Sequence, residues 1–381
     1  MESNRLNVAV VGCGAVAMER HLPALSRLRH KGVNVAAVCD INPALAATAA
    51  RAFKVANAYN NLEQMFSSEK LDVIDVCVPP AIHASVAKAA MEHGCHVLLE
   101  KPMATSVADC DLMIETSKKH NVKLGVVHNN SFHRGYMEFQ NRVEKRVVGD
   151  LCGLRIYWTT PPHEMLSLQD HWAHRLPGGL IGETMPHIVY LTLPFVGAVE
   201  NVSVHAWKVS NYPWVRFDNY SVFIAGDRGN ASIVLSYTNN SHVVWFDALG
   251  TEGVLHLDLN SRSIFRHRCR RLSPSAVGRS ILSDMAQLAS SSIKGVFSKF
   301  AKSDYAGRGH DRAIISFVES IVNSTPLPVT AMDGRETVRV VDMIVKQIEG
   351  VTTPPVIAGR KARTKGMSGS SGVSCNMSRS Q

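Results

Sequence analysis

Residues 6–17 read LNVAVVGCGAVA, an apolar run that leads into a glycine-rich turn and then into a predicted helix. The turn fits the dinucleotide-binding fingerprint G-x-G-x-x-A in its required setting between a strand and a helix. Gly12 permits the tight turn, Gly14 lets a pyrophosphate approach the backbone, and Ala17 lets the helix pack closely on the strand. Free N–H groups and the positive dipole end at the start of the helix suit phosphates. The stretch therefore predicts a dinucleotide-binding α/β domain.

An acidic residue follows the second predicted strand. Asp40 comes directly after residues 33–39 and twenty-six residues after Gly14, where a carboxylate accepts both hydroxyls of an adenosine ribose. This carboxylate would repel a 2′-phosphate, and the following residues, Ile41 and Asn42, offer no arginine to bind one. We therefore expect NAD rather than NADP as the cofactor.

The pattern around these motifs predicts a doubly wound parallel sheet over residues 1–128. Apolar runs rich in Val, Ile and Leu on both faces are typical of covered parallel strands, and helical patterns alternate with them. The expected strands cover residues 6–11, 33–39, 73–78, 96–99 and 123–127, and the expected helices cover residues 17–30, 43–53, 62–66, 82–93 and 107–120.

The remaining folded part, residues 129–359, predicts an α+β substrate-binding domain. Alternating apolar positions separated by glycine-containing turns indicate a mostly antiparallel open sheet. The tail at residues 360–381 has almost nothing to bury and is expected to be disordered. The expected strands cover residues 154–158, 202–209, 221–225, 231–237, 243–248 and 254–257, and the expected helices residues 137–148, 312–323 and 334–348.

Length and composition restrict the class of protein further. The chain has 381 residues, of which 45% are hydrophobic and 19% charged, as is typical of a globular protein with two or three domains. No apolar run approaches the length of a membrane span, and the first residues do not resemble a signal peptide, so we expect a cytoplasmic protein. Eight cysteines without a CxxC pair indicate neither a disulfide framework nor a metal site.

The net charge of +9 is concentrated in two segments. Residues 262–302 hold nine Lys or Arg against one acidic residue, and residues 360–381 hold five against none. A nucleic-acid interface needs basic residues across a folded face, so we expect no nucleic-acid partner. Within the first segment, residues 277–300 place apolar side chains near one helical stripe. This pattern fits peripheral contact with an anionic membrane, or a helical insertion that covers the active site or contacts a subunit, and the second interpretation is favoured.

Three residues suggest acid–base chemistry. Lys101 lies in Glu100-Lys101-Pro102 after the fifth predicted strand, and ligands of open α/β sheets bind at the carboxyl ends of the strands. Glu183 and His187 are four residues apart, so a helix would place both on one face, where the carboxylate can orient the imidazole. Simpler interpretations are a solvated loop cation for Lys101 and a surface contact for the pair.

Together these motifs resemble the Gfo/Idh/MocA family of NAD(P)-dependent oxidoreductases, which includes glucose-fructose oxidoreductase and inositol 2-dehydrogenase. The resemblance implies a Rossmann domain followed by an α/β domain whose open sheet often mediates homodimers or homotetramers. It also implies that Lys101, Glu183 and His187 form the catalytic group. The resemblance covers about residues 5–350 and includes further similar segments at 72–83, 94–102, 126–132, 309–317 and 328–334.

The chain departs from the family pattern at several positions. The family usually has Asp where this chain has Glu183, Gly where it has Met185, and often Asp where it has Tyr190. Pro186 would delete a backbone hydrogen bond if it lay inside a helix, although it could instead begin one. Ser131 replaces a usual Arg, which weakens the case for an anionic substrate group there.

Two sets of residues are expected to line the binding sites. His83 follows Pro79-Pro80 on a predicted helix, where a structural role is favoured. The candidates for the substrate pocket are Tyr136, His163 and Trp172. The residues expected around the cofactor are Gly12, Gly14, Ala15, Val16, Ala17, Asp40, Ile41, Val78, Pro79, His83, Glu100 and Lys101.

The leading functional hypothesis is hydride transfer between NAD and a secondary alcohol of a sugar, cyclitol or nucleotide-linked sugar. In it His187 exchanges the hydroxyl proton, Glu183 orients His187, and Lys101 stabilises the developing oxyanion. One alternative is an epimerase or eliminase that holds NAD tightly and uses it transiently. Another is a non-catalytic NAD-binding regulatory protein.

Overall fold

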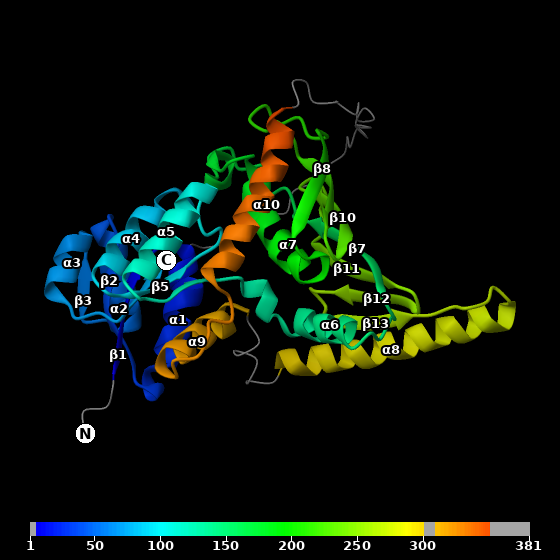
Figure 1. Ribbon diagram of the computed structural model, residues 1–381, viewed down its shortest axis with the longest axis horizontal. Helices are drawn as coiled ribbons and strands as arrows, with labels where there is room; N and C mark the ends of the chain where they lie inside the picture. The colour runs from blue at the N-terminus through cyan, green and yellow to red at the C-terminus, as the bar shows by residue number, and fades with distance from the viewer. Residues whose placement is uncertain (1–4, 301–308, 351–381) are drawn as a thin grey trace, which may run out of the picture.

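The computed structural model describes residues 5–300 and 309–350, which form two sheets with helices packed around and between them (Figure 1). The N-terminal sheet has six parallel strands in the order β3-β2-β1-β4-β5-β6. Its strands are β1 (Leu6–Val11), β2 (Val33–Cys39), β3 (Asn57–Tyr59), β4 (Val73–Val76), β5 (His96–Leu99) and β6 (Leu124–Val126). The predicted doubly wound Rossmann domain is confirmed.

Helices cover both faces of this sheet, as the apolar character of its strands requires. They are η1 (Ala17–His21), α1 (Leu22–Arg27), η2 (Arg29–Lys31), α2 (Pro43–Phe53), α3 (Leu62–Ser68), η3 (Pro80–Ile82), α4 (His83–Glu92) and α5 (Val107–Lys119). The helix expected at residues 17–30 is divided into a π-helical segment, a short α-helix and a 3₁₀ turn. Pro23, which has no N–H to donate, stands just after the π segment.

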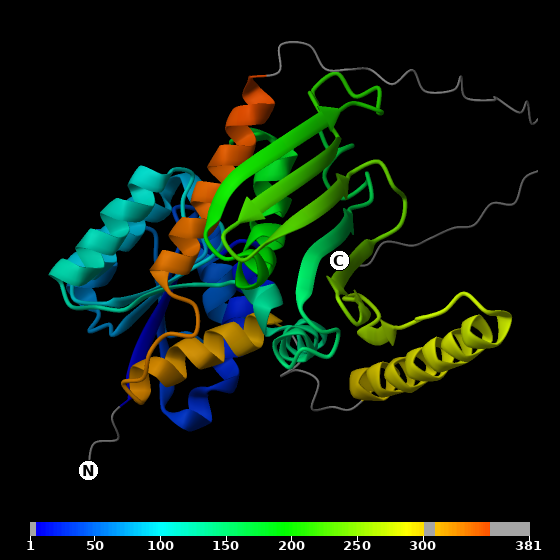
Figure 2. The ribbon, with the colours of Figure 1, turned by 45° about the vertical axis from the view of Figure 1, so that its right-hand side comes forward.

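The second sheet has seven strands in the order β13-β12-β11-β7-β10-β9-β8 (Figure 2). Its neighbouring strands are antiparallel except for the parallel pair β7 and β10, so the predicted mostly antiparallel sheet is also confirmed. Its strands are β7 (Leu151–Thr159), β8 (Val199–Trp207), β9 (Asn219–Gly226), β10 (Gly229–Ser236), β11 (Val243–Gly250), β12 (Gly253–Asp258) and β13 (Ser263–His267).

The helices of the second half join the two sheets. The capping box at Thr330 and Asp333 begins α10, near the start that the sequence indicates. The expected helix at 137–148 runs instead from Arg134 to Glu144. The helices are η4 (Asn129–Phe132), α6 (Arg134–Glu144), η5 (Trp172–Arg175), α7 (Leu180–Val196), α8 (Pro274–Phe300), α9 (Gly309–Val322) and α10 (Ala331–Glu349).

The boundary predicted at residue 128 separates the two sheets but not the two cores. In α9, Ile314 and Phe317 are buried in the core of the Rossmann domain. Along α10, Val338 packs with the Rossmann domain, whereas Ile344 packs with the second sheet. The C-terminal helices therefore return to the first domain and fix it to the second. The predicted disordered tail at 360–381 lies outside the described residues.

Within residues 5–300 and 309–350, no helix has both the length and the apolar character needed to cross a bilayer.

The packing of α9 against the Rossmann sheet gives a test of this domain connection. Phe317 is 2% exposed, and a side chain at Gly125 of β6 would meet its ring at 2.8 Å. We expect Phe317→Ala to lower the free energy of unfolding by about 3–5 kcal/mol, because it leaves a cavity. Val322→Ala on the same helix, at a position that is 61% exposed, should change it by less than about 0.5 kcal/mol in urea denaturation. Equal effects would show that α9 does not stabilise the Rossmann core.

Candidate active site

The dinucleotide turn lies at the carboxyl end of β1, where the geometry permits only glycine at its first position. Gly12 has φ +93°, and a Cβ there would lie 2.6 Å from the backbone carbonyl of Cys77. Around Gly14 no atom lies within 4 Å of the Cβ position, so the backbone is open to a phosphate. These residues fit a bound dinucleotide.

Asp40 lies beside this turn at the end of β2. Its two carboxylate oxygens accept hydrogen bonds from the N–H groups of Cys13, at 2.7 Å, and Asn42, at 2.8 Å. The backbone thus fixes the carboxylate while its other lone pairs stay available to ribose hydroxyls. Ile41, which is 92% exposed, extends next to it. Asp40 and Ile41 thus lie next to the dinucleotide turn, and their contact with an adenosine stays a prediction.

His83 serves to hold loops together. Its ring is fully buried, with Nε2 2.9 Å from the carbonyl oxygen of Val78 and Nδ1 3.1 Å from that of Pro102. Burial lowers the pKa of this imidazole. The ring has no exposed surface for a cofactor, so its place in the predicted cofactor set is corrected, and the structural interpretation of His83 agrees with these contacts.

Lys101 and Glu183 form an ion pair between the two domains. Lys101 follows β5, and its Nζ donates to Glu183 Oε1 and, at 3.2 Å, to the Glu183 carbonyl oxygen. Glu183 lies in the first turn of α7. Burial tends to raise the pKa of the Glu183 carboxyl, but the Lys101 ammonium, the largest opposing effect, holds it at about 2. The Glu183 carboxylate therefore stays charged across the neutral pH range.

His187 is oriented by Tyr190 and not by Glu183. The distance from His187 Nδ1 to the Tyr190 hydroxyl is 2.8 Å, whereas the Glu183 carboxylate bonds to Lys101 and Thr184. The prediction that Glu183 positions the imidazole through a hydrogen bond is therefore wrong. Tyr190 was noted only as a departure from the family pattern, although its i, i+3 spacing from His187 was a signal for this contact.

The hydrogen bonds around Tyr190 define the protonated ring nitrogen. The hydroxyl accepts from the Asn130 N–H at 3.1 Å and donates its only proton to Asn129 Oδ1 at 3.1 Å. We therefore assign the proton between Tyr190 and His187, which are 2.8 Å apart, to Nδ1 of the imidazole, so that the Asn130 amide nitrogen, 3.4 Å from the same Nδ1, makes no hydrogen bond to it. This tautomer leaves Nε2 as the basic nitrogen.

The surroundings of His187 keep its imidazole neutral. Burial and the nearby Lys101 ammonium lower its pKa to about 3, against a smaller opposing effect of Glu183. The Trp158 indole stacks over the ring with the planes 12° apart. A neutral histidine with a free Nε2 is a base that can accept a proton at neutral pH.

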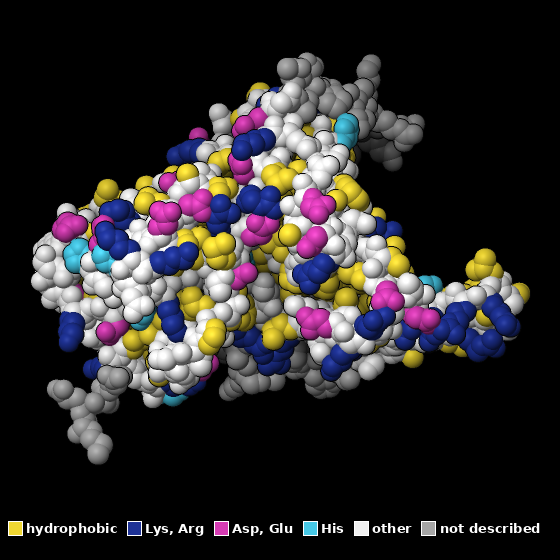
Figure 3. Space-filling model, viewed as in Figure 1, with side chains coloured by type: hydrophobic (Ala, Val, Ile, Leu, Met, Phe, Trp, Pro, Cys, Tyr) yellow, Lys and Arg dark blue, Asp and Glu magenta, His cyan; other side chains and the backbone are white. Residues whose placement is uncertain are grey.

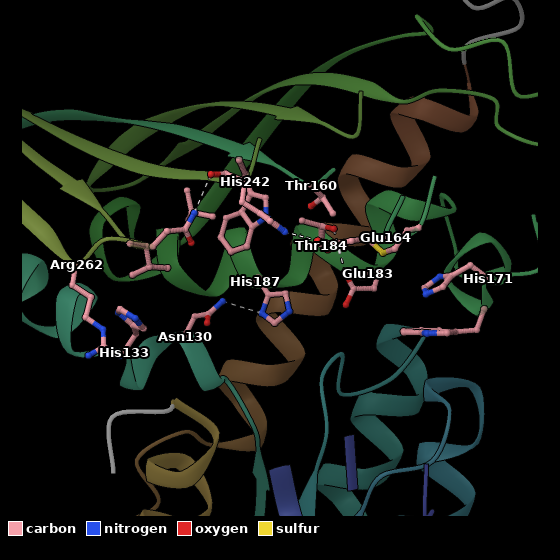
Figure 4. A pocket seen from close by; sticks show the side chains of 16 residues that line it. Asn130, His133, Thr160, Glu164, His171, Glu183, Thr184, His187, His242 and Arg262 are labelled. Carbon is pink, nitrogen blue, oxygen red and sulfur yellow. Dashed lines mark hydrogen bonds and ion pairs between the residues drawn. The ribbon is translucent and has the colours of Figure 1, made fainter. Parts of the chain in front are cut away.

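A cavity of about 620 Å³ opens between α7 and the second sheet. Figure 4 shows His187, Asn130 and Glu183 on one wall and His242, Glu164 and His171 farther along it. Its lining mixes indole rings with hydrogen-bonding groups, and Lys101 is bound to the Glu183 that lines it. Lys101 and His187 therefore converge on one site.

The structure separates the three candidates for the substrate pocket. Trp172 lines the cavity. His163 is exposed and lies outside the cavity lining. Tyr136 is fully buried in the second core and donates its hydroxyl proton to the Leu191 carbonyl, so it is a packing residue. His163 and Tyr136 are therefore not pocket residues, which corrects the prediction. They were chosen for their residue type, and residue type alone does not show which side of a helix or loop faces the cavity.

A buried ion cluster next to Lys101 was not predicted from the sequence. His21, at the end of the π segment, has Nδ1 2.8 Å from Asp75 Oδ2 and Nε2 2.8 Å from Glu100 Oε1. Burial would lower the pKa of His21, but the Asp75 carboxylate raises it well above its usual value. His310 of α9 approaches Glu100 at 3.6 Å. Asp75 and Glu100 stand at the carboxyl ends of adjacent strands, but nothing local in the sequence brings His21 to them.

This group also includes the one arrangement with metal-like spacing among the residues that the structure describes, namely His21, Asp75 and Cys77. Both ring nitrogens of His21 are occupied by carboxylates. Burial raises the pKa of the Cys77 thiol to about 12, so the sulfur stays protonated and is a poor ligand. The contacts describe a hydrogen-bonded ion cluster.

The structure thus brings a Rossmann turn, a carboxylate suited to a ribose, a lysine bound to Glu183 and a histidine together near one cavity of the second domain. Residues 6–128 match the oxidoreductase family with an NAD-binding Rossmann fold (GFO_IDH_MocA). The Rossmann domain of the chain belongs to this family, as the sequence motifs predict.

Several known proteins are similar to this chain. It is 31% identical over 160 residues to the D-glucoside 3-dehydrogenase of Escherichia coli, covering 42% of this chain. It is 30% identical over 246 residues to the inositol 2-dehydrogenase of Salmonella typhimurium, covering 63% of this chain. The matches span only 44% and 66% of the lengths of these relatives.

The fold is also found in a solved structure. The WlbA dehydrogenase from Bordetella pertussis, in complex with NADH and UDP-GlcNAcA, superposes with a TM-score of 0.74 at 19% identity. The superposition covers 92% of this chain and 98% of that one. It shows that the two-domain architecture is shared.

The environment of His187 gives a test that needs no substrate. In a histidine NMR titration, we expect the His187 ring to stay neutral as the pH falls through 6.5, its usual pKa, because burial and Lys101 disfavour the cation. His187→Gln identifies the signal by its loss. A His187 signal that titrates near 6.5 would contradict the described environment.

Proposed function

We propose that the protein transfers a hydride between NAD and a secondary alcohol carbon of a sugar, cyclitol or nucleotide-linked sugar. The observation that carries the proposal is that His187 lines the same cavity as Glu183, the carboxylate that binds Lys101. Neither a solvated loop cation nor a surface pair would be buried in this way, since the side chains of Lys101 and Glu183 are only 11% and 20% exposed.

The residues divide the proton chemistry between them. Bound NAD supplies the hydride acceptor at nicotinamide. His187 Nε2 takes the hydroxyl proton as the C–H hydride leaves and the carbon becomes a carbonyl, and it returns that proton in the reverse direction. Two of the three Lys101 donor positions bind Glu183, and in this proposal the third stabilises the negative charge that develops on the alcohol oxygen.

Glu183 has a different part in this scheme from the one that the sequence suggests. It holds the Lys101 ammonium in place through two hydrogen bonds. Its charge also opposes, in part, the effect of Lys101 on His187. Glu183 therefore balances the charge of the site, whereas Tyr190 orients the base.

The substrate class follows from the cavity and the relatives. Asn130, Glu164 and His171 offer hydrogen-bonding groups, while Trp158 and Trp172 offer flat apolar surfaces, a combination that suits hydroxylated rings. The names of the relatives refer to a glucoside and inositol, and WlbA was solved with a nucleotide-linked sugar. This supports a polyhydroxylated ring as the substrate.

Activity measurements test the proposal. We expect NADH to form when the protein is given NAD and a panel of sugars, cyclitols and nucleotide sugars, and NADP to be a poorer acceptor because of Asp40. Lys101→Met and His187→Gln should each lower kcat by about 10²–10⁴-fold. Bound NAD released on denaturation without NADH formation on any substrate would contradict net dehydrogenation and favour transient redox chemistry or a regulatory role.

Substitution of Tyr190 gives a further test by enzyme kinetics. Tyr190→Phe keeps the ring that stacks on His128 at 4.2 Å but removes the acceptor of His187 Nδ1–H. We expect kcat to fall by about 10- to 100-fold with KM nearly unchanged, because orientation of a general base acts in the transition state. An unchanged kcat would show that Tyr190 does not position the base.

We also propose that the outer face of the second sheet binds another copy of the chain. Phe223 of β9, Val234 of β10 and Trp245 of β11 are 42%, 36% and 41% exposed in the second sheet, where β7 lies between β10 and β11, an apolar surface of the kind that subunit contacts cover. Phe223→Ser combined with Trp245→Ser should shift sedimentation equilibrium toward monomer. A wild-type protein that is already monomeric would contradict this proposal.

A further inference from the structure

Helix α8 lies apart from both cores and is attached through its polar face. Among the positions of α8 whose burial the structure describes, the more buried ones are Ala276 and Val277 at its start and then Ser280, Asp284, Gln287 and Ser291, which follow at spacings of four and three. In Figures 1 and 2, α8 runs beside β13 and extends away from the Rossmann domain. An ordinary surface helix buries the opposite, apolar face.

The contacts of this polar face explain the attachment. Strand β13 is at the edge of the second sheet, so its backbone groups need partners. The Gln287 amide accepts from the Arg266 N–H at 3.0 Å and donates to the Arg266 carbonyl at 3.1 Å. Asp284 pairs with His267 at 2.6 Å, and the Ser280 hydroxyl donates to the Arg268 carbonyl.

The apolar face of α8 consequently points outward. The large apolar side chains of this face are 42% to 67% exposed, and Leu272, just before the helix, is 89% exposed. We call this the α8 apolar face. It comprises Ile281, Leu282, Met285, Leu288 and Ile293.

Basic residues gather at the N-terminal end of the α8 apolar face. Arg268, Arg270 and Arg271 precede the helix and Arg279 lies in it, and Figure 3 shows dark blue side chains gathered at the end of α8 that points away from the Rossmann domain. Between residues 272 and 300 the sequence has a single acidic residue, Asp284, whose carboxylate is turned inward to His267.

We propose that α8 docks on an anionic lipid surface, lying in the membrane interface with its apolar face toward the acyl chains. An exposed apolar stripe with arginines at one end is the arrangement that such surfaces bind. Glu252 pairs with Arg268 and Arg270 and offsets one of their two charges, so this end of the helix keeps a net positive charge together with Arg271 and Arg279. Pairing of two copies through α8 would bring basic residues together at both ends, because Lys294 and Lys299 follow the stripe in the sequence as Arg268–Arg271 precede it. Charge complementarity therefore favours lipid headgroups over a second copy.

Vesicle flotation of the full chain tests the proposal. The protein should float with vesicles of phosphatidylglycerol and phosphatidylcholine and should not float with phosphatidylcholine alone, and added salt should weaken the binding. The triple variant Ile281→Ser, Leu282→Ser, Met285→Ser should bind at least about tenfold more weakly, because the apolar contact is lost. Arg271→Glu combined with Arg279→Glu should abolish the preference for the anionic lipid.

A matched control separates this effect from general loss of surface apolarity. Leu112→Ser, Val322→Ser, Met332→Ser removes side chains that are 42%, 61% and 55% exposed on other helices, and it should bind vesicles as the wild type does. Circular dichroism checks that both triple variants fold. Failure of the wild-type protein to float, or equal flotation of the α8 variant, would overturn the proposal. So would a wild-type dimer that the α8 variant converts to monomer in the absence of any vesicle binding.

Discussion

The ion cluster of Asp75, His21 and Glu100 is the interaction on which the site depends. Two buried carboxylates on adjacent strands would be costly unless a cation lay between them. A neutral imidazole can donate only one hydrogen bond, whereas both ring nitrogens of His21 face carboxylates, so His21 is an imidazolium. The raised pKa of His21 and the pKa of about 2 for Glu100 agree with this charge state.

The cluster links three parts of the molecule to Lys101. His21 ends the segment that follows the dinucleotide turn, Asp75 and Glu100 stand on β4 and at the end of β5, and Glu100 accepts the Lys101 backbone N–H at 3.0 Å. Lys101 in turn holds Glu183 of α7.

The effect of pH on stability has opposite directions for His21 and for the two glutamates. Stability from His21 is present below pH 6.5 and is lost as the pH rises through its elevated pKa, whereas stability from Glu100 and Glu183 is lost as the pH falls toward 2.

Much of the fold was predictable because its signals are local. Continuous apolar runs marked five of the six parallel strands, and the Thr330 capping box marked α10. The three-residue strand β3 and the edge strand β13 were missed, because short strands have little periodicity of their own. The ion cluster was missed for a different reason. His21 contacts partners that are 54 and 79 residues away in the sequence, and no local sequence pattern predicts such contacts. Tyr190 was noticed, but only its fold-dependent contact with Asn129 and Asn130 shows what it does.

Helix α8 shows the limit of periodicity as a guide. The spacing of apolar residues over 277–300 correctly indicates an amphipathic helix, but the usual assumption that the apolar side is buried fails here. The edge of β13 needs hydrogen-bonding partners, and Gln287 supplies them from the polar face. Because the polar face packs against the sheet, the 100° turn per residue of a helix places Ile281, Met285 and Leu288 on the exposed side. The membrane interpretation, the less favoured one from sequence alone, therefore gains its support from a requirement of the sheet edge.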